Sequence, residues 1–195
     1  MTTLHRHPEH LDVLVERDVV THGAARKALA ALRIGYGLTF LWAFFDKLLA
    51  LGFATGKDTE TGVVDYFGPD AWINGGSPTF GFLNFGVSPD NPFQGFFNSM
   101  AGAAWADWLF MLGLLGIGLA LTLGVGIRLA AISGGLLYVM MWAASLPLAN
   151  NPVIDDHLIG LVTLIVLALT LAGDTWGAGK QWATTNIVRR FPVLR

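Results

Sequence analysis

Four long apolar stretches alternate with polar segments along the chain, and this pattern predicts four membrane-spanning helices. We expect spans at about residues 28–51, 108–127, 129–148 and 157–173. The second is the clearest, because no charged residue lies between Asp107 and Arg128. About 20 apolar residues are enough for one helical crossing. The expected fold is therefore an all-α integral membrane protein, a four-helix transmembrane bundle.

The distribution of Lys and Arg predicts the orientation of this bundle. Basic residues flank the first span, occupy the turn between the second and third, and follow the fourth: Arg26, Lys27, Arg33, Arg128, Lys180, Arg189, Arg190 and Arg195. All of them fall on one side, which the positive-inside rule makes cytoplasmic. We therefore expect a multi-pass protein of the inner or plasma membrane, with a cytoplasmic tail at 1–25, a membrane domain at 26–176 and a cytoplasmic tail at 177–195.

The segment at 53–104, between the first two spans, is much longer than a simple connector needs. It carries no charge from Ala71 to Ser88 and is rich in aromatic residues, while several glycines and prolines prevent one long helix. An aromatic, irregular and uncharged segment fits an extracellular lid at the membrane interface. A loosely structured loop is the alternative, and it would leave many aromatic side chains in water.

Composition agrees with a membrane protein and excludes several other classes. Of the 195 residues, 53% are hydrophobic and only 13% are charged. The net charge of −2 gives no basic face for phosphates, so we do not expect nucleic-acid binding. The chain has no cysteine, which excludes disulfides, thiolate nucleophiles and iron–sulfur ligation within it.

Two ionisable residues near the outer end of the first span need an explanation. Asp46 and Lys47 follow Arg33 by thirteen and fourteen residues, which places them about 20 Å further along a helix. A charge at that depth is costly unless it is paired or reaches the interface. We expect one of them to face the bundle, or else Lys47 to reach outward while Asp46 binds a backbone group.

A second polar group opens the fourth span. Asp155 or Asp156 is suited to cap that helix, and His157 precedes an uncharged stretch of only about 24 Å, shorter than the hydrocarbon core of about 30 Å. His157 should therefore lie at or below the membrane boundary, where an imidazole beside carboxylates either relays protons or makes a structural hydrogen bond.

No metal or haem site is evident in this pattern. The spacing of His157 and its neighbouring carboxylates matches no metal motif, and His157 is the only histidine in the expected spans, which excludes two-histidine haem ligation. His5, His7 and His10 resemble a metal-binding tract, but they lie in a polar terminus and fit a flexible tail better.

The four-helix plan and several short motifs together resemble the DoxX/DoxD family, over roughly Arg33 to Trp176. The motifs are Trp72-Ile73, Gly76-Ser77-Pro78-Thr79, Gly81-Phe82-Leu83, Asn151-Pro152 and Asp155-Asp156-His157. A well-known branch of this family is the membrane subunit of thiosulfate:quinone oxidoreductase. The resemblance implies a quinone-linked membrane component that works with other protein subunits. It also makes Trp72, Ser77 and Asn151 candidate quinone contacts.

These observations lead to a first functional hypothesis, a membrane subunit of a quinone-linked oxidoreductase or respiratory assembly. Its quinone pocket would lie between the bundle and the lid near the outer face, and its candidate catalytic residues are His157, Asp155, Asp156, Asp46 and Lys47. Quinone reduction takes up protons, which a histidine and carboxylates are suited to supply. The alternative is a non-catalytic accessory subunit that packs against a larger membrane complex. A small transporter fits less well, because the sequence has no clear internal repeat and no charge at the midplane.

Overall fold

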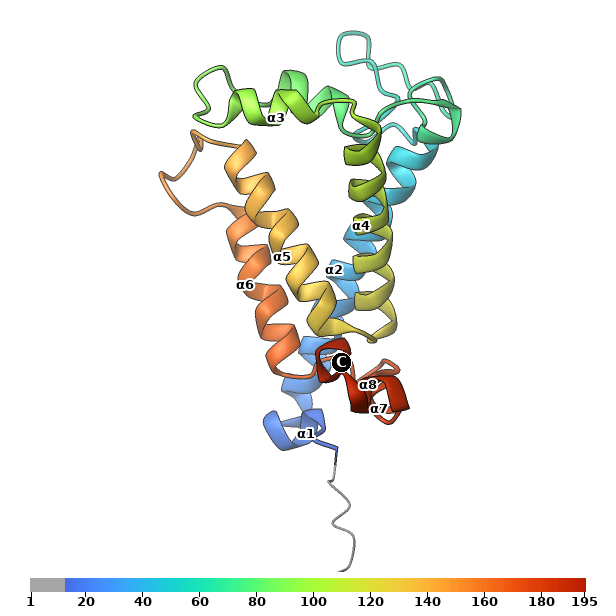
Figure 1. The fold of residues 1–195 in the computed structure, drawn as a ribbon, viewed down its shortest axis with the longest axis vertical. Coiled ribbons are helices and arrows are strands. Elements are labelled where there is room, and N and C mark those ends of the chain that lie inside the picture. The colour runs from blue at the N-terminus through green and yellow to red at the C-terminus, as the bar shows by residue number, and fades with distance from the viewer. Residues whose placement is uncertain (1–12) are drawn as a thin grey trace, which may run out of the picture.

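The computed structural model describes residues 13–195 and shows an all-helical protein in that range. Its long helices are α2 (Gly23–Leu49), α4 (Ala104–Leu123), α5 (Ile127–Ala144) and α6 (Asp156–Leu169). Figure 1 shows α2 beside α4 and α5 beside α6, with the two pairs close together at one end and apart at the other. The predicted tract at His5, His7 and His10 lies outside the described residues.

Within the described residues, three helices are long and apolar enough to cross a membrane: α2, α4 and α5. The fourth, α6, is apolar but has only 14 residues. Large apolar side chains on these helices point outward, for example Leu112 on α4, which is 58% exposed, and Leu136 on α5, which is 65% exposed. Apolar exteriors of this extent are typical of a protein surrounded by lipid. The structure therefore indicates an α-helical membrane protein.

The four long helices begin and end within a few residues of the four predicted spans. Helices α4 and α5 begin earlier than the predicted spans, at Ala104 and Ile127. Helix α2 also begins earlier, five residues before the predicted start. The turn between α4 and α5 contains Gly124 and Gly126, both with positive φ, which glycine adopts without strain. The α5 helix ends at Ala144, before Pro147.

Glycines allow close packing within each helix pair. A Cβ atom at Gly37 of α2 would lie 2.7 Å from the main-chain nitrogen of Thr122 of α4, so only glycine permits this approach. On α5, Gly134 and Gly135 are similarly close to Leu164 and Leu161 of α6. Gly134 and Gly135 thus allow α5 and α6 to pack closely, whereas a Cβ atom at Gly116 of α4 would meet no other atom of the described residues within 4 Å.

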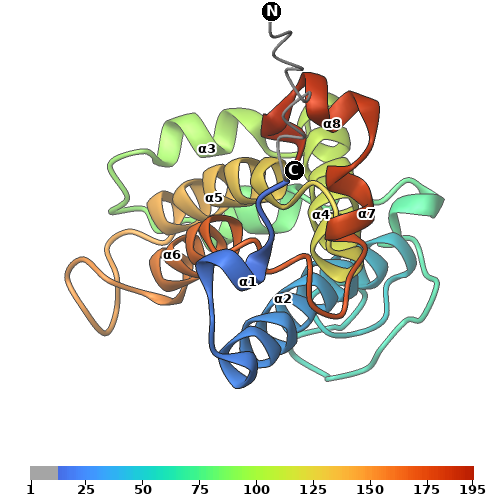
Figure 2. The same cartoon turned by 90° about the horizontal axis from the view of Figure 1, so that it is seen from below.

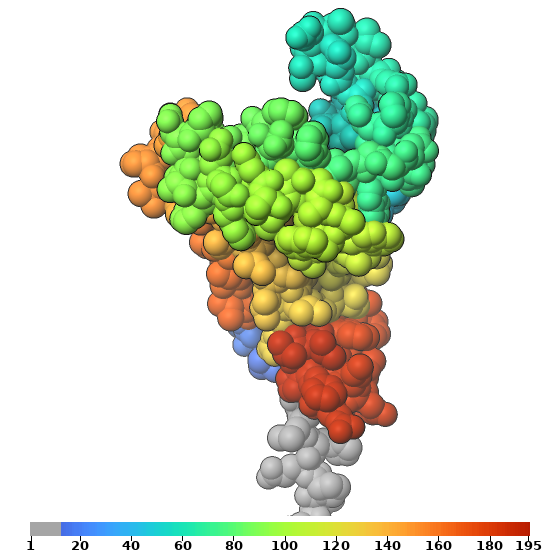
Figure 3. Space-filling model, turned by 45° about the horizontal axis from the view of Figure 1, so that its top comes forward, coloured from blue at the N-terminus to red at the C-terminus, as the bar shows by residue number. Residues whose placement is uncertain are grey.

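The segment between α2 and α4 covers the end of the bundle where the two pairs stand apart; we call this end the lid end. The segment contains two short helical turns, η1 (Trp72–Asn74) and η2 (Phe82–Gly86), and one short helix, α3 (Gln94–Met100). Figure 3 shows its second half spread over the helices as a cap. Phe97 and Val87 pack on Ala144 of α5 and form a small apolar core separate from that of the bundle.

The opposite end, which we call the terminal end, holds both ends of the described chain. Figure 2, which views this end, shows the short helix α1 (Glu16–Val19) near α2 and α6, with α7 (Gly179–Ala183) and α8 (Asn186–Arg190) at the same end of the protein. A final turn, η3 (Pro192–Leu194), packs against α5. Both predicted tails therefore contain ordered helical segments.

A fully buried arginine joins the helices at the terminal end. Arg33 is 0% exposed and lies inside α2, in the half of the helix nearer the terminal end, whereas the sequence indicated a flanking position. Its guanidinium donates to main-chain carbonyl oxygens of two other chain segments. In α4 these acceptors are Leu121 and Thr122, the latter at 3.0 Å; after α6 they are Ala172 at 3.0 Å, Thr175 at 3.2 Å and Trp176 at 3.0 Å. One side chain thus binds carbonyl groups that the end of α4 leaves without helical partners and carbonyl groups of the loop after α6.

Replacing Arg33 with Met should strongly destabilise the fold, because the methionine fills similar space but leaves several buried carbonyl groups without donors. We expect a loss of about 3 kcal/mol or more in the free energy of unfolding. Arg33→Lys, with fewer donors, should give an intermediate loss. Denaturation in detergent micelles measures the effect, and Lys27→Met, at an exposed position on the same helix, is the control. Equal stability of the Arg33→Met and Lys27→Met proteins would show that the buried contacts contribute little.

Candidate functional site

A histidine and an aspartate form the best-defined polar pair at the lid end, at the start of α6. Asp155 is the N-cap residue of this helix, and its Oδ1 accepts a hydrogen bond from the main-chain N–H of Leu158 at 3.1 Å. This is the usual contact of an N-cap carboxylate. Its other oxygen, Oδ2, lies 2.6 Å from Nδ1 of His157. One carboxylate therefore both starts the helix and fixes the imidazole ring.

The contacts of Asp155 keep its carboxyl group ionised. Partial burial raises the pKa of Asp155, but hydrogen bonds from the His157 ring and the Leu158 N–H together outweigh it and hold the pKa below its ordinary value. An ionised carboxylate can only accept a hydrogen bond, so Nδ1 of His157 is the nitrogen that carries the hydrogen. The other ring nitrogen, Nε2, is left for another partner. The His157 side chain is 21% exposed, so this partner has access to it.

Two tyrosines continue from His157 toward the interior of the bundle. The ring of Tyr138 on α5 lies 6.2 Å from that of His157, and the ring of Tyr36 on α2 lies 6.4 Å from that of Tyr138, centroid to centroid. Gly160 makes room for this row, since a Cβ atom there would lie 2.7 Å from Cζ of Tyr138. The Tyr36 hydroxyl lies 3.5 Å from Oγ1 of Thr163, its acceptor on α6. Three helices thus contribute to one polar row beneath His157.

Asp156 lies close to this pair but faces away from the protein. Its Oδ1 is 3.6 Å from Nδ1 of His157, and its side chain is 93% exposed. One ligand atom from each of Asp155, Asp156 and His157 lies within 4.8 Å of the others, a spacing that would fit a metal ion.

The structure places Asp46 and Lys47 in a different part of the lid end. Both carboxylate oxygens of Asp46 accept main-chain N–H groups, from Phe53 at 3.0 Å and Ala54 at 2.9 Å, and the side chain is 1% exposed. The Lys47 ammonium lies over the ring of Phe110, 5.9 Å from its centroid. Asp46 thus organises the turn that follows α2, as the backbone-binding alternative predicted.

Trp72 and Ser77 also lie on the side of α2 and α4. The Trp72 ring packs edge-on against Trp108 of α4, with centroids 4.7 Å apart. Ser77 donates a hydrogen bond to Asp107 at 2.9 Å. Asn151, in contrast, lies just before α6, where its Oδ1 accepts the main-chain N–H groups of Val153 and Ile154, each at 2.9 Å. Each of these side chains shapes the backbone or packs on a neighbouring helix.

The candidate residues therefore form two groups. Asp155, Asp156, His157 and Asn151 belong to the α5 and α6 pair, whereas Asp46, Lys47, Trp72 and Ser77 belong to the α2 and α4 pair. Figure 1 shows the lid ends of the two pairs standing apart. Within the described part of the chain, no hydrogen bond or ion pair joins one group to the other.

Two residues that fix the lid were not singled out in the sequence. Asp107, in the first turn of α4, is 7% exposed and accepts hydrogen bonds from the Ser77 hydroxyl, the Thr79 hydroxyl at 2.6 Å and the Thr79 N–H at 3.2 Å. Asn91 donates from Nδ2 to the carbonyl oxygens of Ala143, Ala144 and Leu146, at 2.8, 3.0 and 2.8 Å, and so caps the end of α5. Asp107 had a visible signal, since it is the charged residue immediately before the uncharged run from Trp108 to Ile127.

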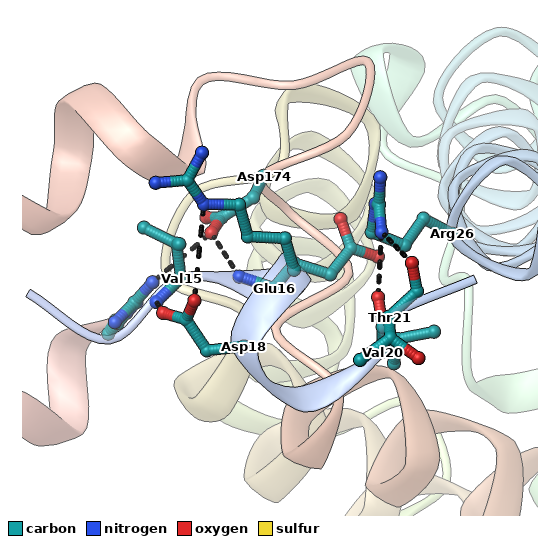
Figure 4. Close-up of polar contacts among 9 residues, drawn as sticks. Val15, Glu16, Asp18, Val20, Thr21, Arg26 and Asp174 are labelled. Carbon is teal, nitrogen blue, oxygen red and sulfur yellow. Dashed lines mark hydrogen bonds and ion pairs between the residues drawn. The ribbon is translucent and has the colours of Figure 1, made fainter. Parts of the chain in front are cut away.

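The terminal end contains a second cluster of buried charges, drawn in Figure 4. The Asp174 carboxylate accepts the main-chain N–H of Glu16 at 2.8 Å and lies 3.3 Å from the Arg195 guanidinium. The Glu16 side chain is buried, and one of its oxygens accepts the Thr175 hydroxyl while the other, Oε1, has no partner in the described residues. Burial raises the pKa of Glu16, and the nearby Asp174 carboxylate adds to this rise against the hydrogen bond from Thr175.

Comparisons with protein-family models, with curated proteins and with solved structures find no match to this chain.

Replacing Asp107 with Ala should loosen the lid, because the Ser77 and Thr79 groups would lose their buried acceptor. Opening of the segment at 77–83 should become easier by about 1–3 kcal/mol. Hydrogen–deuterium exchange measured on peptides from that segment should be about tenfold faster. The control is Asp70→Ala, which changes an exposed aspartate elsewhere in the segment between α2 and α4. Unchanged exchange in the Asp107 variant would mean that the lid does not depend on this carboxylate.

Replacing Glu16 with Gln should change how stability depends on pH. Because its pKa is raised above 4.5 in the folded protein, Glu16 contributes stability that is fully present below pH 4.5 and is lost as the pH rises through the folded-state pKa. Glutamine does not titrate, so the melting temperature of the variant minus that of the wild type should increase from pH 4.5 toward neutrality. Glu60→Gln, at an exposed glutamate, should show a constant difference. A constant difference for Glu16→Gln would refute the assignment.

Proposed function

We propose that the chain is a membrane subunit of a quinone-linked oxidoreductase or respiratory assembly, and that it belongs to the DoxX/DoxD family. One observation carries this proposal: His157 is held by the Asp155 carboxylate at 2.6 Å and stays partly exposed at the end of an apolar helix pair. A histidine oriented in this way is suited to give a hydrogen bond or a proton to a ligand from Nε2. The aromatic and aliphatic surroundings suit a ligand that is itself apolar.

The chemistry needs both protons and electrons. Conversion of a quinone to a quinol takes up two electrons and two protons, and the electrons would come from a partner subunit, since the chain has no redox-active cysteine. In the protonated state, Nε2 of His157 would donate to a quinone oxygen and pass its proton there. The Asp155 carboxylate would stabilise the imidazolium, and the exposed part of the ring would take up the next proton from water. The proposal is confined to His157 and Asp155, because Asp46, Lys47, Trp72 and Ser77 lie with the other helix pair.

We further propose that all four long helices cross the cell membrane, with both termini in the cytoplasm and the lid outside. The terminal end carries Arg128, Lys180, Arg189 and Arg190, and the lid end is acidic, which supports this orientation. The α6 helix measures only about 21 Å over its 14 residues, against about 30 Å of hydrocarbon. Residues 170–173, which follow α6 at the terminal end, would complete its crossing.

Quinone binding tests the proposal directly. Protein in detergent micelles is titrated with a ubiquinone analogue that has a short alkyl tail, comparing wild type, His157→Gln and the control His22→Gln, which changes an exposed histidine at the other end of the bundle. We expect the His157 variant to bind at least about tenfold more weakly, the loss of about one hydrogen bond to a charged donor, and the control to bind as wild type does. Equal binding by all three proteins would exclude a quinone site at His157.

An accessory role in a larger complex is the second candidate, because the lid exposes large aromatic side chains. Phe85 is 76% exposed and Phe96 is 54% exposed. Apolar groups exposed to this extent outside the four long helices suit a protein partner. Purification from native membranes distinguishes the two functions. A stoichiometric complex whose activity survives His157→Gln would favour the accessory role, whereas loss of activity would favour the quinone site.

A further inference from the structure

A long apolar groove of about 560 Å³ runs between α5 and α6. Ile132, Leu136 and Val139 line one side from α5, and Leu161 and Ile165 line the other from α6. These positions recur every three or four residues, so each set forms one stripe along its helix. Leu136 is 65% exposed and Ile165 44%, which shows that the groove is open to the surroundings of the protein. Its volume lies within the range of small-molecule sites.

Small residues explain why a groove exists here. Gly135 lets the two helices approach, since a Cβ atom there would lie 2.8 Å from Cδ1 of Leu161, and Ala131 and Ala168 line the same groove. The bulky residues stand at its edges. A channel therefore follows the helix axes with a floor of small side chains and walls of aliphatic ones.

An arginine closes the terminal end of the groove. Arg128 lines it there together with Val193 of η3. One terminal nitrogen of its guanidinium, Nη1, donates to the carbonyl oxygen of Pro192 at 2.9 Å, and its main-chain N–H donates to Arg195 at 2.8 Å. Within the described residues the other guanidinium nitrogens have no hydrogen-bond partner, and no carboxylate forms an ion pair with Arg128. The guanidinium is thus positioned and still has donors for an anion.

The length of the groove matches one leaflet of a bilayer. Arg128 and Val139 are eleven residues apart on α5, which is about 16 Å along the helix. Half of a hydrocarbon core of about 30 Å is about 15 Å. A chain that begins at Arg128 and lies in the groove would therefore end near the middle of the membrane. Arg189 and Arg190 on the neighbouring α8 are exposed and add positive charge at the same end.

We infer that the groove binds an anionic phospholipid, with the phosphate at the Arg128 guanidinium and one acyl chain between α5 and α6. Basic residues beside grooves between membrane helices are suited to such headgroups. The apolar stripe explains the acyl chain and the free donors explain the phosphate, so both parts of the ligand have a counterpart in the structure. The site does not depend on the proposed quinone chemistry, because His157 does not line the groove.

Lipid binding is measured by native mass spectrometry of the full chain in detergent micelles, with phosphatidylglycerol and phosphatidylcholine of identical acyl chains. Wild type should bind phosphatidylglycerol about fivefold more tightly than phosphatidylcholine, the preference that one arginine contributes near an anionic headgroup. Arg128→Gln should abolish this preference. Lys57→Gln, which removes one positive charge from an exposed position at the lid end, should retain it.

Two further measurements separate the parts of the inference. Ile165→Trp should block the groove and weaken the binding of both lipids while Arg128 stays unchanged. This variant also tests the inference if the Arg128→Gln protein does not fold. Inorganic phosphate at millimolar concentration should not displace phosphatidylglycerol; displacement would reduce the site to an anion contact and overturn the lipid assignment. Equal affinity of the wild type for the two lipids would also overturn the lipid assignment. Efficient formation of a disulfide-linked dimer by the Leu136→Cys variant would overturn it too, because a second copy of the chain would then cover the groove.

Discussion

The arrangement of the bundle depends on one buried guanidinium. Arg33 is fully buried and donates to carbonyl groups at the end of α4 and after α6, so three helices converge on one side chain. Carbonyl groups at helix ends have no helical donor, and in an apolar environment each unpaired group is costly. An arginine supplies several donors from one planar group, which a lysine would not do in the same geometry. Hydrogen bonds from Arg33 therefore hold the helices together at the terminal end, and apolar side chains could not make these bonds.

The same requirement separates the structural polar groups of the lid end from the candidate site. Asp46 accepts two backbone N–H groups, Asp107 accepts three donors, and Asn91 caps α5, so the partners of each are supplied by the fold. His157 differs, because Asp155 engages only Nδ1 of its ring. A partly exposed imidazole with one nitrogen still available is a better candidate for chemistry than a carboxylate that already accepts two or three hydrogen bonds within the fold.

Much of the helical architecture could be predicted from the sequence, because uncharged runs in a membrane protein are constrained by the thickness of the bilayer. The sequence also placed Asp155 at a helix start beside His157. It did not separate Asp46 from that pair, because both lie near the same depth and depth carries no information on which helices are neighbours. The partners of Asp46 are main-chain groups of Phe53 and Ala54, which no residue type reveals. Tyr138 was missed for a similar reason, since its contact with His157 depends on the absence of a side chain at Gly160.

The lid has a mechanical role that follows from where it is attached. At the terminal end Arg33 joins the helix pairs, whereas at the lid end they stand apart (Figure 1). The lid bridges this separation, because Ser77 and Thr79 bond to Asp107 of α4 while Asn91 bonds to the end of α5. Phe97 and Val87 pack on Ala144 at the second attachment and bury apolar area there. The lid thus fixes the end of α5 relative to α4, and with it the position of Tyr138 and of the α6 helix that carries His157.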